Sequence, residues 1–217
     1  MNVLIISPLF EGSTSLMRLE AMKQLLPVDT VYDEIDTQEI IDSSTRVYRI
    51  LAYRYKVGPV VRRINRAIGK YPTKEHYDLI WIDKGVFINV SSVRTLKAMT
   101  THLVHYTPDP AFTFHKSKRF YKALKYYDYV VTTKSFELEH YYKYKSEESV
   151  ILVSQAFSAE LHRSLVQFEK RKEEVVFIGH HEDAREEVLA YLINNNIPVT
   201  LSGRGWSKFV KKNKPNI

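Results

Sequence analysis

The 217-residue chain carries 32 Lys and Arg against 25 Asp and Glu, a net charge of +7, with 44% hydrophobic and 12% aromatic residues. This composition excludes a disordered chain, and the length suits one large domain, or one ordinary domain joined to part of another. The absence of cysteine excludes disulfides, thiolate metal sites, iron–sulfur clusters and cysteine nucleophiles, while the positive charge favours an anionic partner such as a nucleotide phosphate, nucleic acid or an acidic membrane surface.

The first third of the chain alternates short apolar runs with amphipathic segments. A buried strand is expected at "NVLIIS" (2–7), then a loop and a helix over 15–26 that Ser13 or Thr14 would cap. A second strand is expected over 28–35, followed by a basic helical region over 43–70. This region should break at Gly58-Pro59, because proline lacks the amide hydrogen and disfavours helix in the residue before it.

The same alternation continues to residue 157. Strands are expected over 77–83, 101–107, 127–133 and 149–157, with helices near 89–99, 118–127 and 134–144 and a loop over 108–117. The helix near 89–99 would be capped by Asn89 or Ser91. Strands and helices at this spacing predict an α/β fold, a Rossmann-like parallel sheet with helices on both faces.

After Phe157 the pattern changes and then restarts. Residues 158–174 are polar and lack a strong apolar period, whereas a strand (174–179), a helix (183–195), a strand (197–203) and a basic tail (208–217) follow. We therefore expect a first domain over 1–157, a linker over 158–172 and the start of a second domain over 173–217. A single β-α-β unit cannot cover both faces of its sheet, so this last part should dock on the first domain, remain partly mobile or pair with another chain.

The apolar run at the start of the chain, Val3 to Ile6, is too short for a signal sequence or a membrane span. A cytoplasmic protein is the expectation that fits this best. The paired histidines in "GHHEDAREE" invite a metal hypothesis, but a zinc-binding helix needs His-Glu-x-x-His, and Arg185 stands four residues after His181. We therefore predict no metal site there.

Glycines follow both strands of the second domain. Gly179 ends one strand, and Gly203 and Gly205 flank Arg204 after the next. In open parallel sheets, ligands bind beyond the carboxyl ends of the strands, where glycine lets the backbone approach a phosphate. These residues indicate either a phosphate-facing loop or ordinary turns.

Polar residues also follow the strands of the first domain. The first loop contains Gly12, Ser13 and Thr14, which would cap the helix or touch a substrate. Two further candidate groups lie at the same edge of the predicted sheet, which favours a binding site there. Alternatively, Lys84 pairs only with Asp83, and Pro108-Asp109-Pro110 only shapes a turn. These groups are Asp83 and Lys84 after one strand, and His105, Tyr106 and Asp109 at the end of the next.

The basic helical region interleaves cations with Tyr, Leu, Val and Ile. It could contact anionic lipid or nucleic acid, or it could simply be a solvated cationic face. Its cations are Arg46, Arg49, Arg54, Lys56, Arg62, Arg63, Arg66 and Lys70.

The chain resembles bacterial two-domain glycosyltransferases of the GT-B fold, in particular the group related to the spore-maturation protein CgeB. The resemblance covers nearly the whole chain and rests on the following segments, in order: "LIISPLFEGSTSLMRLEAM", "GPVVRRINRAI", "DLIWIDKGVFI", "LVHYTPDPAF", "YDYVVTTKSFELE", and "VVFIGHHEDAREEVLAYL" through "SGRGW".

The resemblance implies an acceptor-binding N-terminal domain and a C-terminal domain that binds a nucleotide sugar, with no metal or other cofactor. Gly179 and His180 would begin the phosphate loop, and Gly203, Gly205 and Trp206 would end its second strand. The acceptor side of the cleft would include Gly12, Ser13, Thr14, Lys84 and Tyr106. Asp83 or Asp109 would be the general base that activates the acceptor hydroxyl, whereas His105 would be structural.

Two features depart from the family pattern. In the hinge, Ser158, Ala159 and Ser164 replace the usual Asp and prolines, although His162 remains. The donor domain should also extend well beyond Trp206, so we expect this chain alone to be inactive and to associate with itself through the incomplete domain.

Two hypotheses follow. The first is part of a glycosyltransferase, either cytoplasmic or peripheral to the inner face of the membrane, that moves a sugar from a nucleotide donor to a hydroxyl of a glycan or other cell-surface acceptor. The second is a non-catalytic scaffold whose basic face binds a partner, anionic lipid or, less favoured, nucleic acid.

Overall fold

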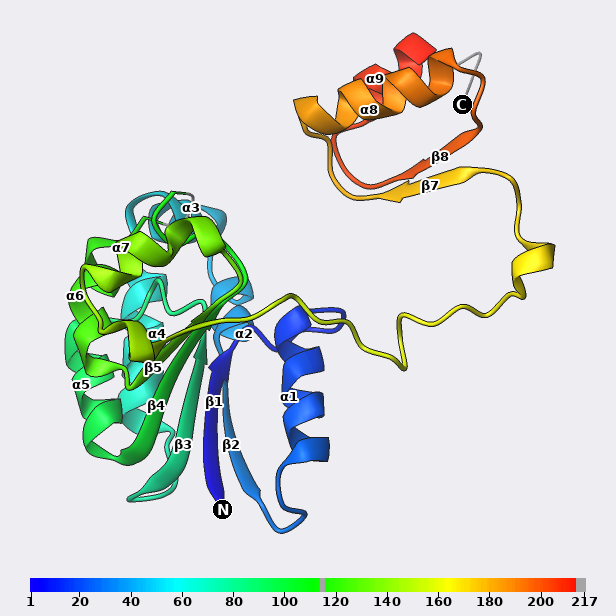
Figure 1. The fold of residues 1–217 in the computed structure, drawn as a ribbon. Coiled ribbons are helices and arrows are strands. Elements are labelled where there is room, and N and C mark those ends of the chain that lie inside the picture. Colours follow the sequence, from blue (N-terminus) through cyan, green and yellow to red (C-terminus); the bar gives the residue numbers. More distant parts are fainter. Residues whose placement is uncertain (114–115, 214–217) are drawn as a thin grey trace. The chain divides into compact units, whose positions relative to one another are not determined.

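The computed structural model describes residues 1–113 and 116–213 (Figure 1). Residues 114–115 of the predicted loop and 214–217 of the predicted tail lie outside the described residues. The chain divides into two units, Met1–Ser158 and Ala159–Ile217, each with its own internal packing. They are described separately below.

The N-terminal unit is built on a six-stranded parallel sheet in the order β2-β1-β3-β4-β5-β6. The α/β, Rossmann-like fold predicted from the sequence is confirmed. The last strand is shorter than predicted, because the pairing of β5 with β6 ends at Thr132 and Leu152. The strands are β1 (Asn2–Ser7), β2 (Val31–Asp36), β3 (Tyr77–Asp83), β4 (Thr100–Thr107), β5 (Tyr129–Thr132) and β6 (Val150–Leu152).

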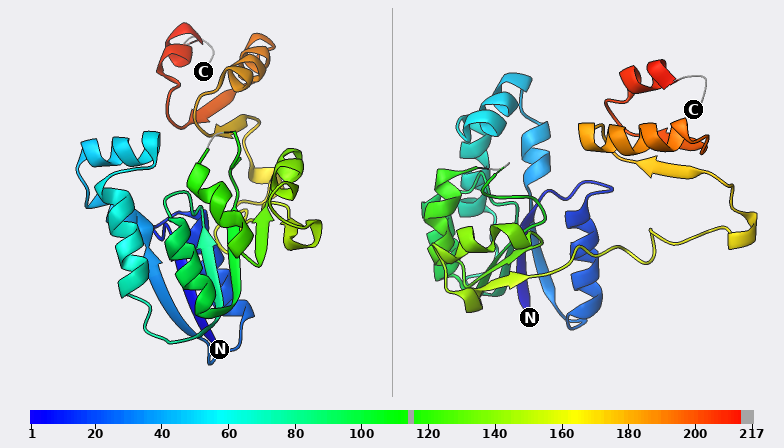
Figure 2. Two further views of the ribbon diagram at one scale, coloured as in Figure 1. Left: turned by 90° about the vertical axis from the view of Figure 1, so that its left-hand side faces the viewer. Right: turned by 45° about the horizontal axis from the view of Figure 1, so that its top comes forward.

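Helices cover both faces of this sheet, as Figures 1 and 2 show. The predicted break at Gly58 is confirmed: Gly58 has φ +101° and Pro59 opens the next helix. The short helix over Thr37–Asp42 was not predicted; Asp36 caps it by accepting the amide hydrogen of Gln38 at 2.8 Å. The helices are α1 (Thr14–Leu25), α2 (Thr37–Asp42), α3 (Arg46–Tyr55), α4 (Pro59–Lys70), α5 (Val90–Ala98), α6 (Lys118–Ala123) and α7 (Leu138–Tyr142), with 3-10 turns η1 (Leu124–Tyr126), η2 (Ser135–Glu137) and η3 (Glu147–Ser149).

Alternation along the buried strands sends side chains to two different cores. On β1, Leu4 and Ile6 enter the larger core, to which α2, α4, α5, α6 and α7 contribute. Val3 and Ile5 face the other way and pack with Leu19 of α1. The sheet therefore has α1 on one face and most of the other helices on the opposite face.

The strand order reverses at β1. The chain passes from β1 outward to β2 and then crosses back to β3, so the connections leaving β1 and β3 diverge at the carboxyl edge. In doubly wound sheets this reversal opens a crevice outside the carboxyl ends of the strands, where ligands bind. The fold thus makes the ends of β1 and β3 the first place to look for a site.

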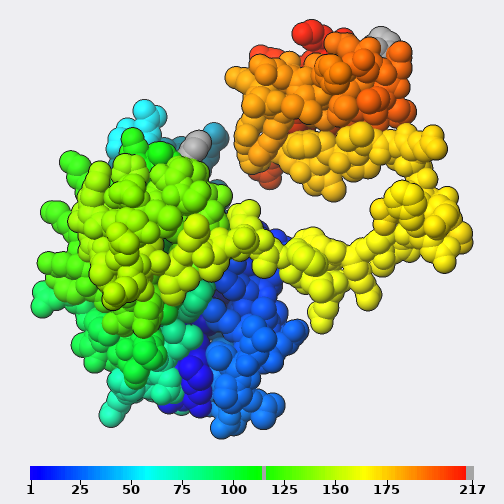
Figure 3. All heavy atoms as spheres, viewed as in Figure 1, coloured from blue at the N-terminus to red at the C-terminus, as the bar shows by residue number. Residues whose placement is uncertain are grey.

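The C-terminal unit contains a two-stranded parallel sheet, and its atoms are coloured from yellow to red in Figure 3. Its core consists of Leu189, Ile193, Val199, Trp206 and Phe209. The basic tail predicted from residue 208 is wrong over 208–213: these residues belong to the helix α9, because Phe209 and Val210 pack into that core. The elements are η4 (Phe168–Lys170), β7 (Val175–Ile178), α8 (Asp183–Asn194), β8 (Val199–Ser202) and α9 (Ser207–Asn213).

Among the described residues, no helix combines the length and the apolar character needed to cross a bilayer. The exposed strand residues Val176 and Ile178, 55% and 78% accessible, lie on a face of the small sheet that the unit does not cover. This agrees with the argument that one β-α-β unit leaves a sheet face open.

Candidate functional site

The candidate site lies at the carboxyl edge of the six-stranded sheet, at the ends of β1, β3 and β4. In the β1–β3 register Ile6 pairs with Ile82, so Ser7 and Asp83 come next in their strands. Asp83 in turn pairs with Tyr106 of β4. The topology therefore brings together residues separated by up to a hundred positions in sequence.

Asp83 is held in a buried ion pair. Arg18 of α1 donates Nη2–H to Asp83 Oδ2 at 3.0 Å, and Trp81 donates Nε1–H to Oδ1 at 2.8 Å. The Asp83 side chain is only 1% exposed. The predicted alternative in which Lys84 pairs only with Asp83 is wrong, because Arg18 pairs with Asp83 and Lys84 pairs with Asp109.

Tyr106 belongs to the same buried cluster. The Arg18 guanidinium lies 3.9 Å from the centre of its ring, and Trp81 stacks on it with ring centres 5.7 Å apart. Burial raises the pKa of the Tyr106 hydroxyl, and the nearby Arg18 charge only partly offsets this. Tyr106 is 6% exposed, so it packs on the α1 face of the sheet instead of lining an open cleft.

Lys84 and Asp109 form the accessible part of the site. Lys84 Nζ lies 2.8 Å from Asp109 Oδ2, and both side chains are more than one third exposed. Lys84 also donates its backbone N–H to the carbonyl of Tyr106 at 3.0 Å. A cation and a carboxylate are thus presented together to solvent at the edge where ligands are expected.

The backbone of Lys84 is unusual. Its φ is +52°, a left-handed conformation that costs a non-glycine residue free energy. Two other non-glycine residues in the described ranges share this feature: Lys56 ends α3, a common left-handed position, and Asn196 is a type that tolerates it. Lys84 does not end a helix, so its left-handed backbone has no such local cause. Backbone strain of this kind is concentrated at functional sites.

His105 stabilises the turn at Lys84 through a hydrogen bond with the next residue, Gly85. The Gly85 amide donates to His105 Nε2 at 3.3 Å, which places the ring proton on Nδ1, an atom with no hydrogen-bond partner in the described structure. The imidazole is 1% exposed. Burial lowers the pKa of His105 to about 3. The structural role predicted for His105 agrees with this position.

The loop that carries Asp109 is fixed by hydrogen bonds. Thr107 Oγ1 accepts the Asp109 amide at 3.2 Å, and Thr133 Oγ1 donates to the Pro108 carbonyl at 3.1 Å. The fully buried Glu137 carboxylate accepts the amides of Ala111 and Phe112 at 2.7 and 2.9 Å. Asp109 is therefore presented from a rigid loop, as a catalytic group requires.

The first loop contributes a cap and exposed groups. Ser13 is the N-cap of α1: its Oγ accepts the Leu16 amide at 3.1 Å and donates to the Pro8 carbonyl at 3.0 Å. Gly12, with φ +79°, and Thr14 are exposed beside it. Capping accounts for Ser13, which leaves Gly12 and Thr14 as the accessible residues of the three.

Besides His105 Nδ1, two more buried atoms of the residues described above have no hydrogen-bond partner in the described structure. They are Ser7 Oγ, in a residue 1% exposed, and Arg18 Nε. Buried polar groups are nearly always paired, so such atoms mark a place where a ligand or water completes the bonding.

The glycines of the C-terminal unit have a packing role. A methyl group at Gly203, whose φ is +138°, would overlap the Gly179 carbonyl, to which the buried Trp206 also donates Nε1–H at 2.8 Å. A methyl at Gly205, φ +92°, would approach His181 Cβ. Close backbone contact therefore explains these glycines without a ligand.

The start of α8 is acidic. His180 is exposed and lies 3.2 Å from Glu182, and the His181 imidazole bonds the Glu186 carboxylate. Glu182 is the N-cap and Asp183 opens the helix. Carboxylates already occupy the anion-favouring end of this helix, so phosphate binding by Gly179 and His180 stays a prediction that this charge distribution opposes.

The basic helical region is highly exposed along α3. Val47 and Ile50 are 62% and 50% accessible, next to the cations Arg46 and Arg54. On α4 the cations alternate with buried Val60, Val61, Ile64 and Ile68, so they form the solvent face of an amphipathic helix. Arg63 instead donates to the hydroxyls of Ser43 and Ser44.

Neither family models nor curated proteins give a match to this sequence. Among residues 1–113 and 116–213, no group of three or more His, Asp or Glu side chains is arranged to hold a metal ion. The candidate site is therefore identified from its geometry alone.

Sequence reasoning missed Arg18, Trp81 and Glu137. Arg18 follows the buried Ser15 at helical spacing, and this was the available signal that it faces the sheet. Glu137 gave no such signal, because its partners are backbone amides of a distant loop.

Proposed function

We propose that this chain is the acceptor-side part of a metal-independent glycosyltransferase that moves a sugar from a nucleotide donor to a hydroxyl of a glycan or cell-surface acceptor. The accessible Lys84–Asp109 pair at the carboxyl edge of the sheet carries the proposal. A Rossmann-like unit followed by a second strand–helix–strand unit supports it.

The two candidate bases differ in how far their carboxylates are exposed to solvent. Asp109 is about one third exposed on a rigid loop, whereas Asp83 is enclosed by Arg18 and Trp81. A general base must come within hydrogen-bond distance of the proton that it removes. Asp109 is therefore our choice for the base, and Asp83 positions Arg18 and the end of β3.

In this mechanism Asp109 accepts the proton of the acceptor hydroxyl while the oxygen of that hydroxyl forms a bond to the anomeric carbon of the donor sugar. The bond from that carbon to the nucleoside diphosphate breaks, and the electron pair leaves with the diphosphate. Lys84 orients Asp109 through their ion pair. Gly12 and Thr14, exposed at the adjoining loop, would contact the acceptor.

Because this chain alone is expected to be inactive, the function is tested with the chain joined to a complete donor domain. Sugar transfer from radiolabelled UDP-, GDP- and dTDP-sugars to glycan acceptors is measured in EDTA, with calorimetry as a separate measure of donor binding. Loss of a general base lowers the rate by roughly 10²- to 10⁴-fold, so Asp109→Asn should fall in that range. Asp29→Asn, an exposed acid between α1 and β2, is the matched control. Absence of both transfer and nucleotide-sugar binding would refute the proposal.

A second candidate function is attachment to an anionic membrane through α3. Val47 and Ile50 are exposed aliphatics beside Arg46 and Arg54, a combination that suits the boundary between acyl chains and acidic headgroups. A nucleic-acid backbone would use the arginines but leave the aliphatic side chains in water. This observation favours lipid.

Cosedimentation with vesicles of phosphatidylglycerol and phosphatidylcholine tests the attachment. Val47→Asp/Ile50→Asp should weaken binding roughly tenfold or more, because two apolar contacts are lost and two like charges are added. Val28→Asp, at a fully exposed valine in the turn before β2, is the control. Equal losses in both variants would argue against a specific role for α3.

A further inference from the structure

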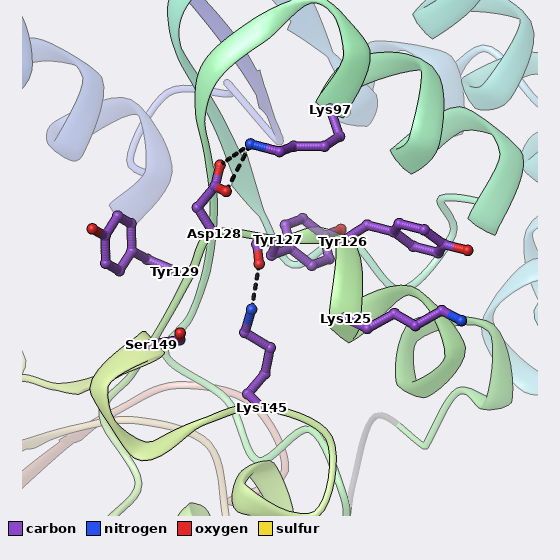
Figure 4. A pocket seen from close by; sticks show the side chains of 8 residues that line it. All are labelled: Lys97, Lys125, Tyr126, Tyr127, Asp128, Tyr129, Lys145 and Ser149. Atoms are coloured by element: carbon purple, nitrogen blue, oxygen red, sulfur yellow. Dashed lines mark hydrogen bonds and ion pairs between the residues drawn. The ribbon is translucent and has the colours of Figure 1, made fainter.

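Two hollows adjoin each other in the N-terminal unit: the first lies at the amino edge of the sheet, beside the starts of β5 and β6, and the second lies beside α6, the start of α5 and the residues that follow α7. Their volumes are about 470 and 590 Å³, and they share Lys125 and Tyr126. Figure 4 shows the first of them. Lysines and tyrosines make up all but three of the lining residues, which are Val90, Asp128 and Ser149.

Part of this lining is fixed by internal bonds. Lys97 Nζ lies 2.7 and 2.8 Å from the two Asp128 oxygens, and the Leu103 amide donates to Asp128 as well (Figure 4). Burial opposes ionisation of Asp128, but these hydrogen bonds outweigh it and hold the pKa of the carboxyl below its usual value. Asp128, the single acid among the described lining residues, is therefore already neutralised.

Within residues 1–113 and 116–213, the other lysines of the lining make no ion pair. Lys145 donates to the Tyr127 carbonyl. Burial lowers the pKa of Lys145; the nearby Asp128 charge opposes this shift in part, and the Lys97 charge adds to it. Lys122, Lys125 and Lys143 are exposed around the shared rim. We name the accessible groups the Lys–Tyr surface, defined as Lys122, Lys125, Lys143, Tyr126, Tyr129 and Tyr144.

Neighbouring side chains lie against the rings of several of these tyrosines. Tyr144 and Tyr121 stack nearly parallel to Phe112, at interplanar angles of 15° and 11°. The Tyr126 ring has the Lys125 ammonium 5.2 Å from its centre. Bases of a nucleic acid need open ring faces on which to stack, whereas sugar hydroxyls and acidic groups need hydrogen-bond donors and cations.

We propose that the Lys–Tyr surface binds an anionic glycan chain. Lysines would pair with carboxylate or phosphate groups along the chain, and tyrosine hydroxyls would bond its sugar hydroxyls. Two joined hollows suit an elongated ligand with repeated charges. The choice of a glycan rests on the proposed function, since an enzyme that elongates or decorates a charged polymer would hold that polymer away from the reacting end.

Fluorescence anisotropy with labelled oligogalacturonate, a carboxylated glycan, tests the proposal on the full chain. The variant Lys122→Gln/Lys125→Gln/Lys143→Gln should weaken binding at least about tenfold, as expected for three ion pairs of surface strength. Arg46→Gln/Arg62→Gln/Arg66→Gln removes the same charge from exposed positions of α3 and α4 and should leave the affinity within about twofold. Neutral dextran of equal length should not bind.

The outcomes separate the alternatives. Equal losses in the two triple variants, or no binding of oligogalacturonate, would overturn the proposal. Tighter binding of oligo(dT), lost in the same lysine variant, would assign the surface to nucleic acid instead. The anisotropy assay involves no donor and no turnover. Glycan binding that persists while both sugar transfer and nucleotide-sugar binding are absent from the chain joined to a complete donor domain therefore refutes the proposed function and leaves this binding site in place.

Discussion

His105 provides the sharpest test of how the core supports the candidate site. Its imidazole packs between Phe120 and Tyr127, with ring centres 4.5 and 5.2 Å away, and accepts the Gly85 amide beside Lys84. Protonation would place a charge in this apolar setting and remove the acceptor. The substitution His105→Gln keeps an oxygen acceptor for Gly85 but removes the titration.

The magnitude follows from the two pKa values. Burial lowers the pKa of His105 from 6.5 to about 3 in the folded chain. Below pH 6.5 the unfolded chain therefore binds a proton that the folded chain rejects, so stability falls as pH falls, down to about pH 3. At pH 5.0, 1.5 pH units below the unfolded value, the loss is about 2 kcal/mol.

Urea unfolding at pH 7.5 and 5.0 measures this loss. The chain has two tryptophans, Trp81 in the N-terminal unit and Trp206 in the C-terminal unit. A Trp206→Phe background therefore makes fluorescence report on Trp81 and its unit alone. His105→Gln should reduce the stability difference between the two pH values by about 2 kcal/mol.

The control is His102→Gln, at an exposed position of the same strand, which should keep the full acid dependence. Carboxylates that titrate near pH 5 contribute equally to all these proteins and cancel in the comparison. If His105→Gln showed the same stability difference as its parent, the buried neutral imidazole would not be the source of acid sensitivity, and the reasoning would be refuted.

The remaining predictions concern the ion pair and two glycines. Arg18→Ala leaves the buried Asp83 carboxylate without its cation and should lower the free energy of unfolding of the N-terminal unit by about 3 kcal/mol; a change below about 0.5 kcal/mol in urea unfolding would contradict this. Gly203→Ala should lower the stability of the C-terminal unit by several kcal/mol, on the order of 3, as read from Trp206 emission in a Trp81→Phe background. Gly69→Ala, where a methyl group meets no atom, should instead raise the stability of the N-terminal unit by about 0.5 kcal/mol, and destabilisation there would count against the helix assignment.

Local features of the fold were predictable because they depend on neighbouring residues. The apolar run at β1, the Ser13 cap and the break at Gly58-Pro59 each follow from the propensity or geometry of a short segment. The helix α9 was missed because a basic composition outweighed one aromatic residue. Phe209 becomes decisive only once α8 and Trp206 offer it a core.

The position of the site was predictable, but the pairing of its charged side chains was not. Asp83, Lys84 and Asp109 follow strand ends, and the parallel sheet puts such ends on one edge. Which cation pairs with which acid depends on α1, whose Arg18 reaches Asp83 and leaves Lys84 for Asp109. No spacing in the sequence encodes a contact between residues 18 and 83.

By itself, the sequence determined the alternation of strands and helices, the parallel sheet and the edge where polar groups gather, since periodicity and turn chemistry are local properties. Only the tertiary structure decided that Asp83 is buried and Asp109 accessible, that the glycines of the C-terminal unit serve close packing, and that lysines and tyrosines meet around two hollows. Burial and ion pairing depend on which distant segments the sheet brings together, and this is set by the order of its strands.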